Sequence, residues 1–147
     1  MADAVKPGGW ILVEEFDNYA IPVSDSKNKD ADFFYKFRKA GGDMVEKRGV
    51  MIDQGFGRNT TSMIKQLGFQ QVGNQGTLFI HQGGDPWSIS VAITYEAGLK
   101  MVEGRGNMSE EELKLMADMD KVNALLHDPS FYHIGPPLIC AWGRKPE

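Results

Sequence analysis

Residues 6–17 constrain the fold of this chain more than any other segment. A Pro-Gly-Gly turn at residues 7–9 leads into the unbroken apolar run at residues 10–13, and acidic residues close the segment. A short apolar run between turn residues and charges is typical of a strand buried on both faces in a parallel sheet. Such a strand lies in the middle of a sheet, yet it begins at residue 10. We therefore expect the sequence to hold one part of an α/β fold, with the other part outside it.

Two later segments are also predicted as strands. Residues 77–81 and 138–142 are short apolar runs that contain β-branched and aromatic residues. The last of these lies near the end of the sequence, so it can be inserted between two other strands. No linker or repeat divides the sequence, and we expect residues 1–147 to form a single α/β domain with a substantial core.

Helices are predicted where apolar residues recur at helical spacing or follow capping residues. The first carries Phe33 and Phe37 on one face, and a glycine pair at residues 41–42 predicts a bend or a close contact at its middle. Asp85 followed by Pro86 is typical of a helix start, and Ser109 with Glu112 is typical of a capping box. The proline-rich and aromatic segment 128–137 is predicted as a rigid loop. The helices are expected at residues 30–47, 60–67, 86–103 and 109–126.

The charge and cysteine content exclude some classes of protein. A net charge of −4 argues against a nucleic-acid surface, because phosphate binding needs clustered basic residues. Cys140 is the single cysteine, so no intramolecular disulfide can form, and a reducing, cytoplasmic location is expected. No apolar stretch approaches the roughly 20 residues that a membrane-spanning helix needs, so no membrane association is expected.

Candidate catalytic residues lie at the end of the first strand and in the aromatic loop. Ligands of open α/β sheets bind beyond the carboxyl ends of strands, which places Glu15, Asp17 and Tyr19 at the edge of an expected pocket. The alternative is that the acids merely mark where the strand meets water. His133 is a candidate acid or base, but the favoured interpretation is a partly buried loop histidine with a satisfied hydrogen bond. The histidines, at positions 81, 127 and 133, do not have the spacing of a metal site, and no metal is expected.

Several stretches together resemble the C-terminal half of a class I S-adenosylmethionine-dependent methyltransferase of the small-molecule type. The first is Lys-Pro-Gly-Gly-Trp at residues 6–10 with the strand that follows, and the last is Asp-Pro-Ser-Phe at 128–131 with Ala-Trp-Gly-Arg-Lys-Pro at 141–146. Weaker matches are Gly-Phe-Gly-Arg at 55–58, Leu-Gly-Phe at 67–69 and Ser-Glu-Glu-Glu at 109–112. The resemblance covers nearly the whole sequence.

The resemblance implies a partial Rossmann-like fold. Residues 10–16, 77–81 and 138–142 would be the fifth, sixth and seventh strands of the family, in the order 5-7-6 with the last strand antiparallel, and four or five helices would accompany them. The first four strands of the family have no counterpart here, so no cofactor-binding residue can be assigned, and no cofactor is expected in this chain alone. S-adenosylmethionine would bind only if the missing half were supplied.

Three functions remain open on this basis. The chain is either a truncated or split methyltransferase acting on a small hydrophobic metabolite, a cofactor-independent isomerase, cyclase or lyase, or a non-catalytic binding partner. A homodimer or a protein partner is expected at the unpaired edge of the first strand. Residues expected to contact a small-molecule substrate are Tyr19, Phe34, Tyr35, Arg38, Arg58, Trp87 and Tyr132.

Overall fold

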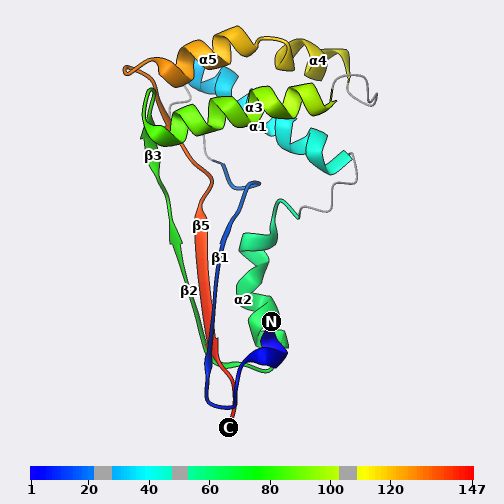
Figure 1. Ribbon diagram of the computed structural model, residues 1–147, viewed down its shortest axis with the longest axis vertical. Coiled ribbons are helices and arrows are strands. Elements are labelled where there is room, and N and C mark those ends of the chain that lie inside the picture. The colour runs from blue at the N-terminus through cyan, green and yellow to red at the C-terminus, as the bar shows by residue number, and fades with distance from the viewer. Residues whose placement is uncertain (22–27, 48–52, 103–108) are drawn as a thin grey trace. The chain divides into compact units, whose positions relative to one another are not determined.

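The computed structural model describes residues 1–21, 28–47, 53–102 and 109–147 (Figure 1). Within these ranges, the side chains of residues 43–47, 99–102, 112, 115 and 116 are not described. The chain forms two compact units. The first, called here the sheet unit, comprises Met1–Ala20, Asp53–Leu78 and Pro136–Glu147, and the second, the helical unit, comprises Ile21–Ile52 and Phe79–Gly135.

The sheet unit is a three-stranded sheet with the order β1-β5-β2. The C-terminal strand β5 lies between the other two and runs antiparallel to both, so β1 and β2 run parallel to each other. This arrangement was predicted for the last strand. The elements of the unit are the single 3₁₀ turn η1 (Ala2–Ala4), β1 (Trp10–Phe16), α2 (Phe56–Gln66), β2 (Gln70–Thr77) and β5 (Leu138–Arg144).

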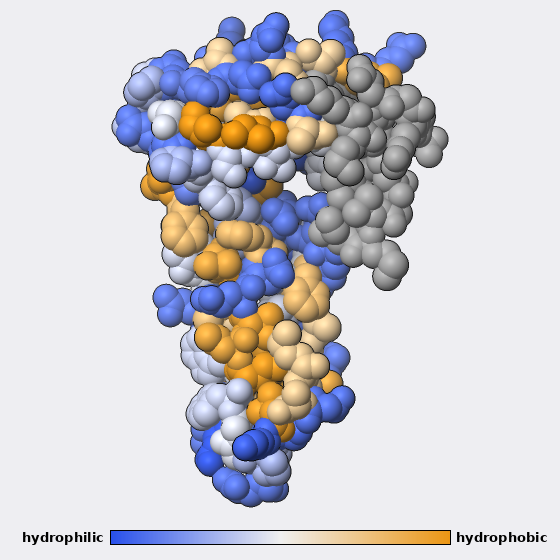
Figure 2. Space-filling view, viewed as in Figure 1, coloured by the Kyte–Doolittle hydropathy of each residue, from blue (hydrophilic) through white to orange (hydrophobic). Residues whose placement is uncertain are grey.

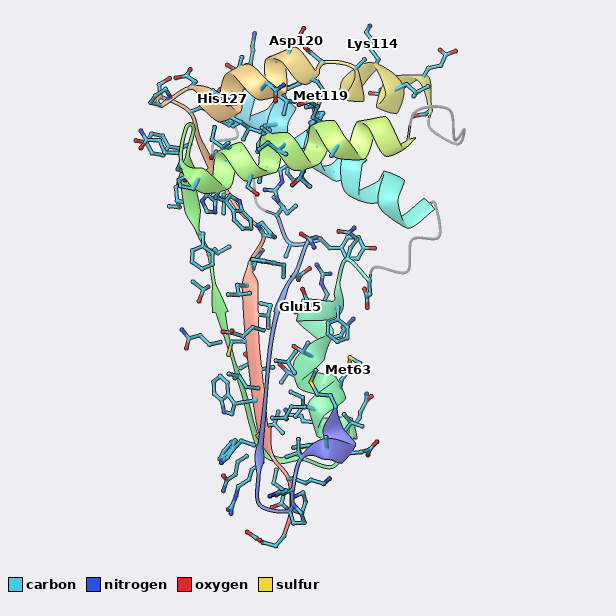
Figure 3. All side chains as sticks on the ribbon, in the orientation of Figure 1. Glu15, Met63, Lys114, Met119, Asp120 and His127 are labelled. Atoms are coloured by element: carbon cyan, nitrogen blue, oxygen red, sulfur yellow. The ribbon has the colours of Figure 1, made fainter. Side chains whose placement is uncertain are left out.

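The helical unit packs helices around an aromatic core and carries a two-stranded ribbon in which β3 and β4 are antiparallel. Phe37, Val122 and Leu126 are fully buried in this core. Met119 and His127 mark the two ends of α5 in Figure 3. The elements of the unit are α1 (Lys29–Lys47), β3 (Ile80–Gln82), α3 (Pro86–Val102), α4 (Glu110–Met116), α5 (Met119–His127) and β4 (Tyr132–Ile134).

The prediction that the first strand is buried on both faces is wrong. Ile11 is 7% exposed and packs with Ile64 of α2, but Trp10 and Leu12, on the opposite face of β1, are 55% and 60% exposed. Side chains alternate along a strand, and α2 covers one face of this sheet only. Figure 2 shows apolar residues on the visible surface of the sheet unit.

The second strand was predicted in the wrong place. The partner of β5 is Gln70–Thr77, whereas Ile80–Gln82 pairs with Tyr132–Ile134 in the separate ribbon. The predicted strand at residues 77–81 therefore spans a break between two strands in two units. The segment 128–137 had been predicted as a loop. It contains the strand β4, which forms by this pairing.

Two helix predictions need adjustment, and a third, for α1, holds. The helix predicted at residues 109–126 is two helices, α4 and α5, with a break at residues 117–118. Helix α2 begins four residues earlier than predicted, while Gly68 follows it with a φ of +81°, as expected of a glycine after a helix end. Helix α1 continues through the glycine pair, and nothing lies within 4 Å of a Cβ built on Gly42.

One of the two predicted helix caps is described by the structure. Asp85 is the N-terminal capping residue of α3, because its Oδ1 accepts a 2.6 Å hydrogen bond from the Ser88 N–H. The side chain of Glu112, in the second predicted cap, lies outside the described residues. No helix in the described part of the chain is long and apolar enough to cross a bilayer.

Candidate functional site

The predicted site residues fall into two groups, one in each unit. Glu15, Asp17, Tyr19 and Arg58 lie in the sheet unit, where β1 ends and α2 begins. The second group lies in the helical unit and consists of Phe34, Tyr35, Arg38, Trp87, Tyr132 and His133.

Asp17 and Arg58 form a close ion pair in the sheet unit. Arg58 donates from Nε to Asp17 Oδ2 at 2.9 Å and from Nη2 to Oδ1 at 2.8 Å. The side chain of Asp17 is 6% exposed and that of Arg58 is 46% exposed. The hydrogen bond to Asp17 raises the pKa of Arg58 above its ordinary value. A carboxylate held by two charge-assisted hydrogen bonds has a fixed orientation and positions the groups around it.

Tyr19 and Glu15 flank this ion pair. The Tyr19 N–H donates to Asp17 Oδ1 at 3.1 Å, and the guanidinium of Arg58 lies over the Tyr19 ring, 5.4 Å from its centroid. Glu15 is exposed on β1, and its Oε1 accepts a hydrogen bond from the Phe16 N–H (Figure 3). Of the two predicted strand-end acids, Glu15 is the one whose carboxylate is accessible.

Two glycines allow α2 to start against the end of β1. A Cβ on Gly57 would lie 2.8 Å from the carbonyl carbon of Phe16, and a Cβ on Gly55 would lie 2.9 Å from the Tyr19 ring. The Asn18 N–H also donates to the Gln54 carbonyl at 2.9 Å. The Gly-Phe-Gly-Arg stretch thus brings Arg58 to Asp17 by close backbone approach.

His133 is buried in the helical unit and contacts Ser88. The distance between His133 Nε2 and Ser88 Oγ is 2.9 Å, and the two side chains are 2% and 0% exposed. Ser88 Oγ is also 2.9 Å from the carbonyl oxygen of Gln82. His133 Nδ1 is buried with no hydrogen-bond partner in the described part of the chain. Of the alternatives for this histidine, the structure therefore shows a buried side chain with one satisfied nitrogen.

The surroundings of His133 favour its neutral form. Burial, followed by the positive charge of Arg38 and the nearby His81, lowers the pKa of His133 from 6.5 to about 4, against the opposing charge of Asp85. The ring is therefore uncharged near neutral pH, and one of its nitrogens has a free lone pair that can accept a proton.

Arg38 is the buried cation of this group. It is 8% exposed, and its Nη1 donates to the Ile134 carbonyl at 2.9 Å. It also hydrogen-bonds Tyr95, whose pKa is raised by burial against the opposing effect of Arg38. No carboxylate in the described residues forms an ion pair with Arg38, and its Nε has no hydrogen-bond partner there.

Aromatic rings surround Arg38 and His133. The His133 ring lies edge-on to Phe34 at 5.0 Å, and the Arg38 guanidinium carbon lies 5.9 Å from the centroid of the same Phe34 ring. Trp87 stacks on His81 at 5.2 Å, and His81 lies 5.4 Å from His133. Phe34 is therefore a core residue beneath both polar groups.

Two predicted substrate contacts lie nearer the surface. Tyr132 is 52% exposed on β4, and Tyr35 is half-buried on α1, the helix that also carries Arg38.

Sequence reasoning missed three polar residues of the second group, namely His81, Asp85 and Ser88. Asp85 was expected only as a helix cap. Its burial disfavours ionisation, but hydrogen bonds from Ser88 and Gln82, with the nearby His81, lower its pKa to about 2. The capping sequence Asp85-Pro86-Trp87-Ser88 could have pointed to Ser88, but the contact with His133 crosses 45 residues and depends on the pairing of β3 with β4.

The described residues hold no group of three or more histidine, cysteine, aspartate or glutamate side chains placed to bind a metal ion. No protein-family model matches the sequence, and no curated protein matches it either.

Proposed function

We propose that the chain is the substrate-side part of an S-adenosylmethionine-dependent methyltransferase-like protein that acts on a small hydrophobic metabolite. The observation that carries this proposal is the strand order β1-β5-β2 with β5 antiparallel between its neighbours. The resemblance of the sequence to the methyltransferase family implied the same order for the last three strands.

The structure changes the residues that would form the sixth strand of that order. The fifth strand would be β1 and the seventh would be β5, as expected. The sixth would be β2, Gln70–Thr77, because this is the strand that pairs with β5. The position of the sixth strand moves from residues 77–81 to Gln70–Thr77, but the antiparallel strand inserted between two parallel ones is retained. This inserted strand is the feature that supports the proposal.

Methyl transfer in this proposal needs a cofactor-binding half that lies outside this sequence, and no residue of this chain is assigned to S-adenosylmethionine. A second polypeptide or another segment would supply it. Unpaired strand edges recruit partners, and β1 pairs on one edge only in the described residues. We therefore also propose that a partner, a second copy or another protein, binds at this edge.

Calorimetric titration with S-adenosylmethionine and S-adenosylhomocysteine tests the proposal. The titration is made on the 147-residue chain after circular dichroism has shown that it is folded. Micromolar binding would support a methyltransferase site rebuilt by association of copies. A folded chain that binds neither compound, alone or with a candidate cofactor-half polypeptide, would contradict methyl transfer.

A cofactor-independent isomerase, cyclase or lyase is the second candidate, and His133 favours it. Its imidazole is neutral, its Nδ1 has no partner among the residues that the structure describes, and it lies in an aromatic setting near the buried cation Arg38. Such a group suits proton transfer to or from a small molecule. Glu15 is the accessible carboxylate that remains as a further candidate acid or base.

Deuterium incorporation from heavy water into candidate metabolites tests this second function. The His133→Gln variant should lose the exchange, whereas the His127→Gln variant, altered at an exposed histidine of α5, should keep it. Exchange that persists in His133→Gln would assign the chemistry to another residue. If neither function is found, a non-catalytic binding role becomes the remaining proposal.

A further inference from the structure

Arg38 is a buried charge that forms no ion pair with any carboxylate in the described part of the chain. Its side chain is 8% exposed, its guanidinium bonds only neutral groups, the Ile134 carbonyl and Tyr95, and its Nε–H has no acceptor in the described residues. Burial of an unpaired cation is costly, and buried arginines are normally paired with carboxylates. Arg38 therefore has the unused capacity to bind an anion.

His133 is the second group with unused hydrogen-bonding capacity, and it belongs to the same cluster. Both Arg38 and His133 contact the Phe34 ring, and the carbonyl that accepts from Arg38 belongs to Ile134, the residue next to His133. Arg38 and His133 are both more than nine-tenths buried, and each has one nitrogen without a hydrogen-bond partner among the described residues.

The hydrogen bonds of Ser88 indicate that His133 Nε2 is a hydrogen-bond donor. Ser88 has one hydroxyl hydrogen but two partners at 2.9 Å, the Gln82 carbonyl oxygen and His133 Nε2. The carbonyl can only accept, so both contacts are satisfied when Ser88 donates to Gln82 and His133 Nε2–H donates to Ser88. Nδ1 then carries a lone pair in the neutral ring and becomes a second donor when the ring takes up a proton.

We propose that Arg38 and protonated His133 bind the carboxylate of a small organic acid. The carboxylate accepts hydrogen bonds from Arg38 Nε–H and His133 Nδ1–H, and its negative charge lies between the two positively charged side chains. The proton on Nδ1 comes from the acid or from water, and no covalent bond forms. The inference goes beyond the proposed function, because it holds whichever reaction the chain performs.

The surroundings select the class of acid. Phe34, Phe131 and the His81–Trp87 stack present aromatic surfaces, which suit an apolar or aromatic carbon skeleton. The two free donors, Arg38 Nε–H and His133 Nδ1–H, match the two oxygens of one carboxylate, whereas the additional oxygens of a phosphate would need further donors. Both groups are buried, so the ligand enters when the unit opens locally, and association is slow.

Charged neighbours determine how binding depends on pH. Protonation of His133 is opposed by Arg38 on α1 and by His81 on β3, and it is favoured by Asp85 at the start of α3; Tyr95 on α3 faces Arg38. Asp85 is already bound by the Ser88 and Gln82 amides, so it does not substitute for the ligand. A bound carboxylate adds a negative charge, so binding takes up a proton. Its affinity rises by up to about tenfold per pH unit as the pH falls from 7.5 to 5.5.

Calorimetry with acetate and benzoate at these two pH values tests the proposal, with benzamide as the neutral control. Binding is expected to strengthen at pH 5.5 and to be accompanied by proton uptake, and benzamide should bind at least about tenfold more weakly than benzoate. The Arg38→Gln variant should also lose at least about tenfold in benzoate affinity, whereas Lys39→Gln, at the adjacent exposed residue of α1, should not.

Histidine NMR keeps the test valid if Arg38→Gln fails to fold. In the unaltered chain labelled with ¹⁵N-histidine, benzoate should shift the Nδ1 resonance of His133 and leave that of the exposed His127 unchanged. The proposal is overturned if neither acid shifts His133 at pH 5.5, if benzamide binds as tightly as benzoate, or if a folded Arg38→Gln variant binds benzoate normally.

Discussion

Arg58 holds the carboxylate of Asp17 through two parallel hydrogen bonds, at 2.9 Å from Nε and 2.8 Å from Nη2. The contact joins the end of β1 to the first turn of α2, and the same carboxylate accepts from the Tyr19 N–H. Asp17 therefore organises the polypeptide at the carboxyl end of β1. The sequence had singled out both residues for catalysis and substrate binding, and the structure brings them together.

Replacing Asp17 with asparagine should destabilise the sheet unit. One acceptor oxygen becomes an NH₂ group that faces the guanidinium, at a buried position, and the expected loss in free energy of unfolding is about 1–3 kcal/mol. Urea unfolding followed by circular dichroism measures it. The control is Glu15→Gln at the exposed neighbour on β1, which should change stability by less than about 0.5 kcal/mol. Equal effects of the two variants would contradict the assigned role of Asp17.

His133 should make the chain less stable in mild acid. Its pKa is lowered from 6.5 to about 4 in the folded chain, so between these values the unfolded chain binds a proton that the folded chain does not. The contribution is complete above pH 6.5 and is lost as the pH falls toward 4. At most it amounts to about 3 kcal/mol.

Unfolding free energies measured between pH 7.5 and 4 test this dependence. The His133→Gln variant should flatten the curve in this window, while His127→Gln should leave its slope unchanged. Asp85, with a pKa near 2, contributes stability that is lost only as the pH falls below 3.8, so the two effects are separable. A flat curve for the unaltered chain would argue against a buried neutral His133.

Two glycine-to-alanine variants should have opposite effects. A Cβ on Gly57 would meet the Phe16 backbone at 2.8 Å, so Gly57→Ala should destabilise by about 1–3 kcal/mol. Gly42 lies inside α1 with nothing within 4 Å of an added Cβ, so Gly42→Ala should stabilise by about 0.5–1 kcal/mol. Thermal or urea unfolding distinguishes them, and destabilisation by Gly42→Ala would show an unexpected contact in the helix.

Association through β1 should depend on Leu12. This residue is 60% exposed on a strand that pairs on one edge only in the described residues, and we expect a dimer at micromolar concentration. Leu12→Lys should give monomers by light scattering with less than about 0.5 kcal/mol change in stability. Leu67→Lys, at a residue 59% exposed after α2, should leave the dimer intact. A monomeric unaltered chain would contradict association at this strand.

Local pattern determined much of the secondary structure. The apolar run and its turn predicted β1, the helical spacing of Phe33 and Phe37 predicted α1, and Asp85 with Pro86 predicted the start of α3. These signals lie within a few residues of one another, and the free energies they report, capping and burial of one face, are local. The strand at residues 138–142 was likewise evident from its composition, and its proximity to the end of the sequence suggested its insertion.

The tertiary structure alone decided where the other strands lie and which polar groups meet. Gln70–Thr77 has no apolar run, and it becomes a strand because β5 supplies hydrogen-bond partners along it, with an irregularity between Gln70 and Gly73. One-sided burial of β1 followed from the placement of α2, and the Ser88–His133 contact followed from the pairing of β3 with β4. Each depends on contacts between segments distant in sequence, whose free energies no local pattern records.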